Sequence, residues 1–293
     1  MDTNRIVEML PAFRTALTDA EKSPATIEKY LRDVRRFAAF LRGRPLTRQL
    51  VLNYKAAIAE EYAVASANSM LASLGAFFRF AGCPELCVRQ FKVQRQPYLP
   101  EEKLLTRKEY ERLVHAAESR PRLQHILQTI CVTGIRVSEL VHITVEAVRQ
   151  GEAVVRCKGK VRTILLVREL QTLLLKYAAQ LGITAGPVFI TRSGRPVDRV
   201  TVWREMKALC ERARILPAKV FPHNLRHLFA RTFYAAGKDI VQLADVLGHA
   251  SINTTRIYTA TTFSAHRRRM ESMHLLVSGI KKATATVAGG IST

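Results

Sequence analysis

The chain has 293 residues, of which 48% are hydrophobic, and its formal net charge is +22 at pH 7. A chain of this length suits two domains, and its hydrophobic content allows folding without disulfides or structural metals. So strong a positive charge predicts a polyanionic partner, most often a nucleic acid, because each neutralised phosphate releases a counterion. Charge alone leaves open a ribosomal or otherwise generally basic protein.

Five cysteines lack the spacing of a zinc site and are expected to be buried or idle thiols in a reducing cytosol: Cys83, Cys87, Cys131, Cys157 and Cys210. The opening segment MDTNRIVEML lacks the basic-then-apolar order of a signal peptide, and no apolar run approaches the length of a membrane span. No P-loop pattern is present. We therefore expect a soluble cytoplasmic protein with no metal, no cofactor and no membrane partner.

Residues 1–91 are expected to form a helical domain. Ser23 and Pro24 give one helix its N-cap and its first residue, where the missing N–H of proline costs nothing. Apolar residues then recur at helical spacing. Further helices are expected to begin near Thr47 and to cover residues 64–81.

A linker is expected over residues 92–103, where the sequence KVQRQPYLPEEK has two prolines, mixed charge and no hydrophobic period. The second domain is assigned to residues 104–282. Thr106 and Glu109 form the capping-box pattern that opens its first helix. Residues 283–293 are small and polar and are expected to form a flexible tail.

A short β-rich segment interrupts the helices of the second domain. Residues 152–157 and 161–167 are predicted strands, with Lys158, Gly159 and Lys160 as the turn between them. Helical patterns dominate before and after this segment. The expected fold class is therefore mainly α with a small antiparallel β-sheet (α+β).

Four short clusters carry residues that suit a phosphate. In TGIRVSEL a glycine precedes a helix start, where Arg136 suits an anion and Glu139 can hold the arginine side chain. The hairpin tip offers Lys158 and Lys160, and a lysine there could donate a proton near a duplex. Taken singly, these features are more often a surface ion pair and solvated lysines.

The other two clusters lie nearer the C-terminus. In HNLRH, His223 and Arg226 are three residues apart, so one helix face can turn both toward the same phosphate. The segment LGHASINTTRIY contributes His249 and Tyr258. A tyrosine hydroxyl becomes a candidate nucleophile only where cationic groups surround it.

Together the four clusters supply what phosphoryl transfer from DNA requires. Negative charge builds on the non-bridging oxygens, and the departing sugar oxygen needs a proton. Two arginines, two histidines and a lysine can meet both needs, since arginine forks match phosphate oxygens. The second half of the sequence offers no carboxylate cluster that would hold a catalytic metal.

TGIRVSEL, the KGK hairpin, HNLRH and LGHASINTTRIY, in this order, resemble the tyrosine recombinases, also called the phage integrase family. The likeness covers the second domain, and residues 1–91 resemble that family's core-binding domain. Because the chain begins almost directly with these helices, a short, Xer-like layout without an arm-site DNA-binding domain is expected. The resemblance implies a site-specific recombinase or integrase that cleaves and rejoins DNA through a covalent 3′-phosphotyrosyl intermediate, without metal or ATP.

The resemblance also implies roles for single side chains. Arg136 and Arg226 would bind the scissile phosphate. His223 and His249 would hydrogen-bond the same phosphate and assist proton transfer. Tyr258 would be the nucleophile that forms the ester with the 3′-phosphate.

Lys158 would be the general acid for the 5′-oxygen, with Lys160 as the competing candidate because the turn is shorter than the commoner GKGxK form. The implied partner is double-stranded DNA at two recombination sites. A homotetramer would bind them, each protomer passing a C-terminal helix, roughly residues 263–276, to its neighbour. Accessory proteins, a different partner subunit, and the choice between a mobile-element integrase and a chromosome dimer resolvase stay open.

Two other functions stay open on the sequence. A type IB topoisomerase-like enzyme also links tyrosine to a 3′-phosphate, but it relaxes supercoils without joining two sites. A non-catalytic DNA-binding module would keep the fold, although the presence of all six expected side chains argues against it. An RNA-binding protein is disfavoured because the 7% of aromatic residues form no base-stacking pattern.

Overall fold

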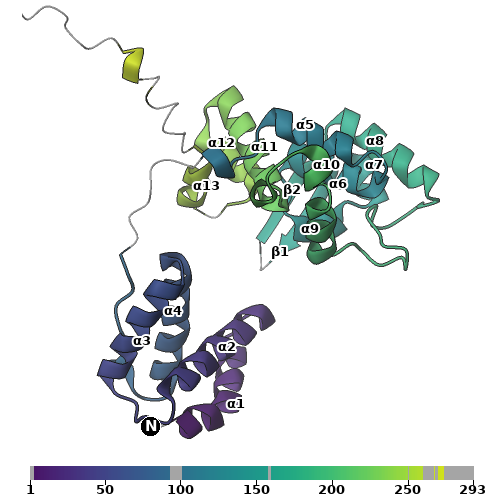
Figure 1. Ribbon diagram of the computed structural model, residues 1–293. Coiled ribbons are helices and arrows are strands. Elements are labelled where there is room, and N and C mark those ends of the chain that lie inside the picture. The colour runs from purple at the N-terminus through teal and green to yellow at the C-terminus, as the bar shows by residue number, and fades with distance from the viewer. Residues whose placement is uncertain are drawn as a thin grey trace, which may run out of the picture. The chain divides into compact units, whose positions relative to one another are not determined.

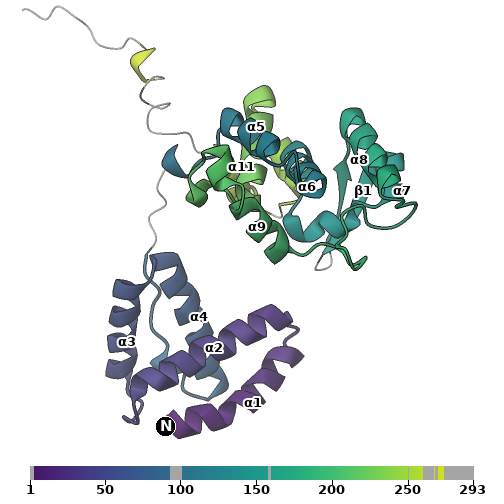
Figure 2. The same ribbon diagram turned by 45° about the vertical axis from the view of Figure 1, so that its right-hand side comes forward.

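The computed structural model describes residues 3–92, 101–157, 160–249, 251–259, 267 and 270–273. The chain divides into two compact units, Met1–Arg95 and Gln96–Thr293 (Figures 1 and 2). Both units are mainly helical, and within the described residues the second holds a two-stranded antiparallel sheet. The expected fold class, mainly α with a small antiparallel sheet, is confirmed.

The first unit contains four α-helices and a 3-10 turn within the described residues: α1 (Thr3–Asp19), α2 (Pro24–Leu41), α3 (Arg48–Glu61), α4 (Val64–Phe80) and η1 (Pro84–Leu86). The helix starts expected from the sequence are confirmed. The side chain of Ser23 accepts a hydrogen bond from the backbone of Thr26, and Thr47 caps α3 in the same way. These caps satisfy N–H groups that have no partner inside a helix.

Aromatic rings fill the centre of the first unit. Phe37 is fully buried, and its ring meets Tyr54 edge-on at 5.1 Å and Phe78 at 5.7 Å between centroids. These residues come from α2, α3 and α4, and edge-to-face contacts of this kind stabilise a core beyond the area that they bury. One aromatic cluster therefore joins three of the helices.

The second unit contains the remaining described elements: η2 (Glu101–Lys103), α5 (Arg107–Ala116), α6 (Pro121–Thr133), η3 (Val137–His142), α7 (Val145–Gln150), β1 (Glu152–Cys157), β2 (Lys160–Leu165), α8 (Arg168–Gln180), α9 (Arg199–Lys207), α10 (Cys210–Ala213), η4 (Pro217–Lys219), α11 (Pro222–Gly237), α12 (Ile240–Leu247) and α13 (Ile252–Thr259). The capping box predicted at the start of α5 is present, with reciprocal hydrogen bonds between Thr106 and Glu109. Helix α11 packs on α6 and also contacts α12 and α13.

The predicted hairpin is formed by β1 and β2. Cys157 pairs with Lys160, so the second strand begins one residue earlier than expected. Val155 and Ile164 are buried on one face of the hairpin, whereas Leu165 on the other face is 70% exposed. Arg162 lies directly across from Val155 and shares its inward face.

Several segments singled out in the sequence fall outside the described residues. They are the centre of the linker (93–100), the hairpin tip (158–159), most of the C-terminal helix (263–276) and the tail (283–293). Among the helices that are described, none combines the length and the apolar character needed to cross a membrane.

The aromatic cluster of the first unit gives a testable stability effect. Replacing Phe37→Ala should cost about 3–5 kcal/mol, because it removes a fully buried ring and leaves a cavity between three helices. In the whole protein, hydrogen exchange followed by mass spectrometry should show faster exchange in α2–α4 and unchanged exchange in α11. Leu52→Ala, at a position that is 39% exposed, is the control. Equal exchange in the Phe37→Ala and Leu52→Ala proteins would contradict this account of the core.

Candidate active site

Five of the six residues singled out in the sequence lie in one region of the second unit, and the sixth, Lys158, lies outside the described residues. Arg136 directly precedes η3, and His223 and Arg226 lie in the first turns of α11. These three line one hollow of about 220 Å³. His249 follows α12, and Tyr258 lies in α13.

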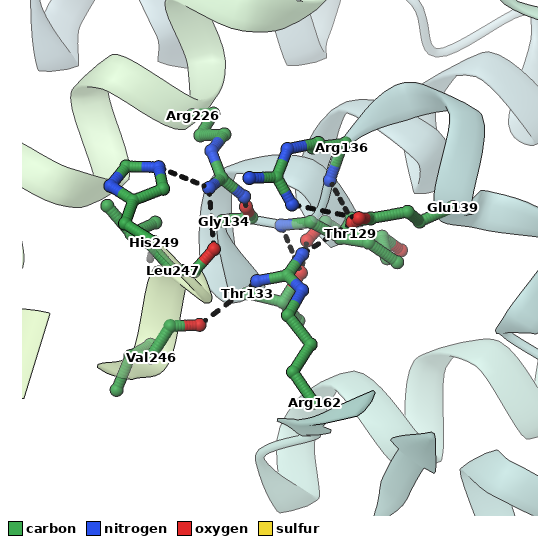
Figure 3. A network of polar contacts seen from close by, with 11 residues as sticks. Thr129, Thr133, Gly134, Arg136, Glu139, Arg162, Arg226, Val246, Leu247 and His249 are labelled. Carbon is green, nitrogen blue, oxygen red and sulfur yellow. Dashed lines mark hydrogen bonds and ion pairs between the residues drawn. The ribbon is translucent and has the colours of Figure 1, made fainter. Parts of the chain in front are cut away.

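Arg226 is the most deeply buried of these residues, with 1% of its surface exposed. One terminal nitrogen donates to the carbonyl oxygen of Gly134, and the other to that of Leu247 at 2.8 Å (Figure 3). Burial, reinforced by the charge of Arg136, lowers the pKa of Arg226 to about 10, and the neighbouring hydroxyl of Tyr258 opposes this lowering. The guanidinium therefore stays charged at neutral pH and joins the ends of α6 and α12.

Arg136 is held by Glu139, as its spacing predicted. The carboxylate accepts the backbone N–H of Arg136 at 2.9 Å and the guanidinium at 2.9 Å. Burial raises the pKa of Glu139, but the hydrogen bond from Arg136 and the charge of Arg162 outweigh it, so the pKa lies below its ordinary value. Because 40% of the Arg136 side chain stays exposed, its guanidinium can still receive an anion from solvent.

Arg162 is a member of the site that was not singled out in the sequence. From β2 it reaches the carboxylate of Glu139 with one terminal nitrogen and the carbonyl oxygen of Val246, at 3.1 Å, with the other (Figure 3). Its side chain is 11% exposed. The available signal was an arginine at an inward position of an alternating strand, since a buried cation needs a partner.

Two glycines allow these close approaches. Gly134 ends α6 with φ of +64°, and Gly248 ends α12 with φ of +62°. A methyl group at Gly134 would overlap the ring of Phe229, and one at Gly248 would overlap the side chain of Arg162. Both positions therefore require glycine for the backbone conformation and for space.

His249 links the buried arginine to α13. Its Nε2 lies 3.0 Å from a terminal nitrogen of Arg226, and its Nδ1 lies 2.9 Å from the hydroxyl of Thr255. Arginine can only donate, so Nε2 must accept and the ring proton belongs on Nδ1. Burial, followed by the charges of Arg226 and Arg136, lowers the pKa of His249 to about 4, which agrees with a neutral ring.

Tyr258 is 3% exposed and is surrounded by histidine rings. Its ring meets His227 edge-on at 4.6 Å, stacks with His249 at 5.7 Å and lies 6.5 Å from His223. The Nδ1 of His227 is buried and has no hydrogen-bond partner among the described residues, and burial lowers the pKa of this histidine to about 4. His227 and Thr255 lie in the motifs HNLRH and LGHASINTTRIY, but no role was predicted for either residue. Their contacts depend on how α13 packs, which the sequence pattern does not show.

The amino-acid sequence of both units matches known protein families and known proteins. Residues 103–265 match the family model described as "Phage integrase family", and residues 11–82 match "Phage integrase, N-terminal SAM-like domain". The chain is 31% identical to tyrosine recombinase XerA of Pyrococcus furiosus over 92% of this chain and 95% of that protein. It is 29% identical to tyrosine recombinase XerD of Pseudomonas aeruginosa over 85% and 89% of the two chains.

Solved structures show the same fold. A crystal structure of XerA recombinase aligns with a TM-score of 0.53 and 27% identity, over 94% of this chain and all of that chain. A lambda integrase dimer bound to a core site aligns with a TM-score of 0.70 and 20% identity, over 86% and 94% of the two chains.

The glycine at the end of α6 should tolerate no side chain. Gly134→Ala should lower the free energy of unfolding by clearly more than Gly194→Ala, a control with φ of +76° and open space around it. The control loses about 1–2 kcal/mol from backbone strain alone, and Gly134→Ala must also displace Phe229. Urea unfolding followed by the fluorescence of Trp203, the single tryptophan, reports on this unit. Equal losses would show that Phe229 does not require this glycine.

The partly buried histidines His227 and His249 should make the protein less stable in mild acid. His227 and His249 stay neutral in the folded state down to a pKa of about 4, whereas in the unfolded chain they bind protons below about 6.5. The unfolded state therefore gains more protons as pH falls from 6.5, and stability decreases. Between pH 6.5 and 5 this loss is separate from that of Glu139, because the unfolded chain begins to protonate this carboxyl only near its ordinary pKa of 4.5, whereas the folded chain resists protonation to a lower pH.

The measurement is the unfolding midpoint at pH 7 and at pH 5. His227→Gln, which cannot be protonated, should show a smaller decrease between the two pH values than the original chain. His115→Gln, at an exposed position of α5, should leave the decrease unchanged. A decrease of the same size in His227→Gln would mean that a different group senses the acid.

Proposed function

Because the chain belongs to the phage integrase family and is a tyrosine-type site-specific recombinase, we propose that Tyr258 is the nucleophile that cleaves DNA and stores the broken bond as a 3′-phosphotyrosyl ester. The observation that carries this proposal is the convergence of two arginines and two histidines on one buried tyrosine: Arg136, Arg226, His223, His249 and Tyr258. No contact among the described residues of the site favours a type IB topoisomerase-like enzyme or a non-catalytic DNA-binding module instead.

The arginines would bind the scissile phosphate. Arg136 lines the hollow with part of its guanidinium exposed, and Arg226 lines its buried end. Guanidinium groups can donate to non-bridging oxygens and offset the charge that these oxygens gain in the transition state. Both groups are fixed by protein contacts before DNA arrives, so little reorganisation is needed at the moment of reaction.

The reaction proposed is a transesterification. The hydroxyl oxygen of Tyr258 forms a bond to phosphorus while the bond from phosphorus to the 5′-oxygen breaks. The phenolic proton leaves the tyrosine, and the 5′-oxygen takes up a proton to become a free hydroxyl. A second 5′-hydroxyl then reverses these steps and rejoins the strand. The number of phosphoester bonds is unchanged, which supports a reaction without ATP.

The histidines would hydrogen-bond the phosphate and assist proton transfer. His249 is neutral in the free protein, and the single negative charge of an arriving phosphodiester would raise its pKa by stabilising the protonated ring. His223, which is exposed and lines the same hollow, would contact the phosphate beside Arg226. Lys158 is proposed as the general acid for the 5′-oxygen, and Lys160 stays the competing candidate.

The proposal is metal-free because the donors of the site suit an anion. Glu139, the buried carboxylate beside the phosphate hollow, is already engaged by Arg136 and Arg162. Across the described ranges, no three histidine, cysteine or acidic residues gather in a way that could hold a metal ion. Guanidinium groups would take the part that divalent cations take in many nucleases.

The proposed partner is double-stranded DNA at two recombination sites, contacted by a helical DNA-binding domain (residues 1–91) and a catalytic domain (residues 104–282). Similarity to a structure described as a lambda integrase tetramer bound to a Holliday junction, with a TM-score of 0.70 and 21% identity, supports assembly as a tetramer. We propose a homotetramer with exchange of a C-terminal helix within residues 263–276. Such a protein would act in the cytoplasm and lie on the nucleoid when bound.

Covalent trapping tests the nucleophile. On DNA from the protein's own genomic neighbourhood carrying nicked sites, the protein should form a covalent adduct, seen as a shifted band on a denaturing gel with EDTA present. Tyr258→Phe should bind DNA with unchanged affinity and form no adduct, because it lacks only the attacking hydroxyl. Tyr234→Phe, in α11, is the matched control and should keep the adduct. An adduct that survives in Tyr258→Phe would refute the assignment, and loss of the adduct in EDTA would refute the metal-free mechanism.

A further inference from the structure

The guanidinium of Arg162 contacts two segments of the site that are far apart in the sequence. Its two terminal nitrogens are directed to different acceptors, the carboxylate of Glu139 and the carbonyl oxygen of Val246 (Figure 3). These acceptors lie 23 and 84 residues from it along the chain. Arg162 therefore joins β2 to η3 and to the end of α12.

The contact with Glu139 bears on the orientation of Arg136. One carboxylate oxygen of Glu139 accepts from the guanidinium of Arg136, and the other accepts from the backbone N–H of Arg136 and from Arg162. The carboxylate is 7% exposed, so water cannot readily replace a lost donor. Removing Arg162 would free this carboxylate to turn, and the guanidinium of Arg136 would turn with it.

The contact with Val246 bears on the position of His249. Val246 lies in the last turn of α12, where carbonyl groups have no partner inside the helix and the helix dipole favours a cation. The side chain of Arg162 also fills the space beside Gly248, where a methyl group would overlap it. His249 is the next residue, so Arg162 fixes the turn from which the histidine extends.

We propose that Arg162 is a positioning residue of the cleavage site, which orients Arg136 through Glu139 and His249 through the last turn of α12. This inference rests on the proposed function. Arg162 is not assigned to the phosphate, because it is not among the residues that line the hollow shared by Arg136, His223 and Arg226, and its terminal nitrogens donate to Glu139 and Val246. Its loss should slow cleavage by DNA that is already bound rather than weaken DNA binding.

The test compares two DNA substrates at saturating protein. One has an ordinary scissile phosphate, and the other has a methylphosphonate there, in which a methyl group replaces one non-bridging oxygen and removes the charge. On the phosphate, Arg162→Met should slow single-turnover cleavage by about 10- to 100-fold, as expected when a charged group is misplaced by about an ångström. On the methylphosphonate the defect should shrink to a few-fold, because this substrate carries less negative charge for Arg136 to stabilise in the transition state. Arg136→Ala should show the same shrinkage.

A purely structural role predicts a different result. If Arg162→Met only reduced the amount of folded protein, cleavage of both substrates would fall by the same factor, and this outcome would overturn the proposal. So would an unchanged cleavage rate on the phosphate. Arg156 is exposed on the neighbouring strand, so Arg156→Met removes one positive charge without affecting Glu139. The ratio of its cleavage rates on the two substrates should equal that of the original chain.

Two further variants keep the test decisive. Arg162→Lys retains a charge near Glu139, but one ammonium group lacks the fork needed for both acceptors, so it should give an intermediate defect even if Arg162→Met folds poorly. Adding Glu139→Gln to Arg162→Lys should slow cleavage by less than the product of the two single defects, because the two residues act through one contact. If the two single defects multiply in the double variant, Arg162 and Glu139 act independently, and this outcome would contradict a route from Arg162 to Arg136 through Glu139. Failure of the original chain to form any adduct would instead reject the proposed function.

Discussion

Two buried arginines satisfy the carbonyl groups at the end of α12, and the site is built around these contacts. Arg226 donates to Leu247 and Arg162 donates to Val246. Each contact removes two costs at once, since a buried guanidinium needs acceptors and the last carbonyls of a helix need donors. The negative end of the helix dipole adds to the attraction. His249 and Tyr258 follow this helix end, so their positions depend on it.

The site holds more positive than negative charge. Three guanidinium groups, from Arg136, Arg162 and Arg226, lie in the site, and the carboxylate of Glu139 is paired with the first two of them. This imbalance disfavours further protons, which is one reason why the pKa of His249 lies near 4 although burial is the larger cause. The same imbalance favours an arriving anion. Such an arrangement suits the proposed phosphate, and the binding of that phosphate would make protonation of the histidine easier.

The sequence was sufficient for features that depend on neighbouring residues. The cap at Ser23 and the capping box at Thr106 follow from local chemistry, and the alternation of the hairpin located both strands within a residue or two. Likewise, the three-residue spacing of His223 and Arg226 placed both on one hollow. Periodicity could also place Arg162 on the inward face of its strand. It could not name the partners of Arg162, because these come from distant segments whose approach depends on packing.

The same limit explains His227, which adjoins Arg226 in the sequence but contacts Tyr258 only because α13 packs on α11. These long-range contacts also have a mechanical consequence. Arg226 and Arg162 both end on the last turn of α12, and one of them also holds Gly134 while the other holds Glu139. Any shift of α12 and α13 that moved Tyr258 would therefore disturb Arg226 directly and Arg136 indirectly, through Arg162 and Glu139. Placement of Tyr258, the proposed nucleophile, and binding of the phosphate that it is proposed to attack are thus coupled through one helix end.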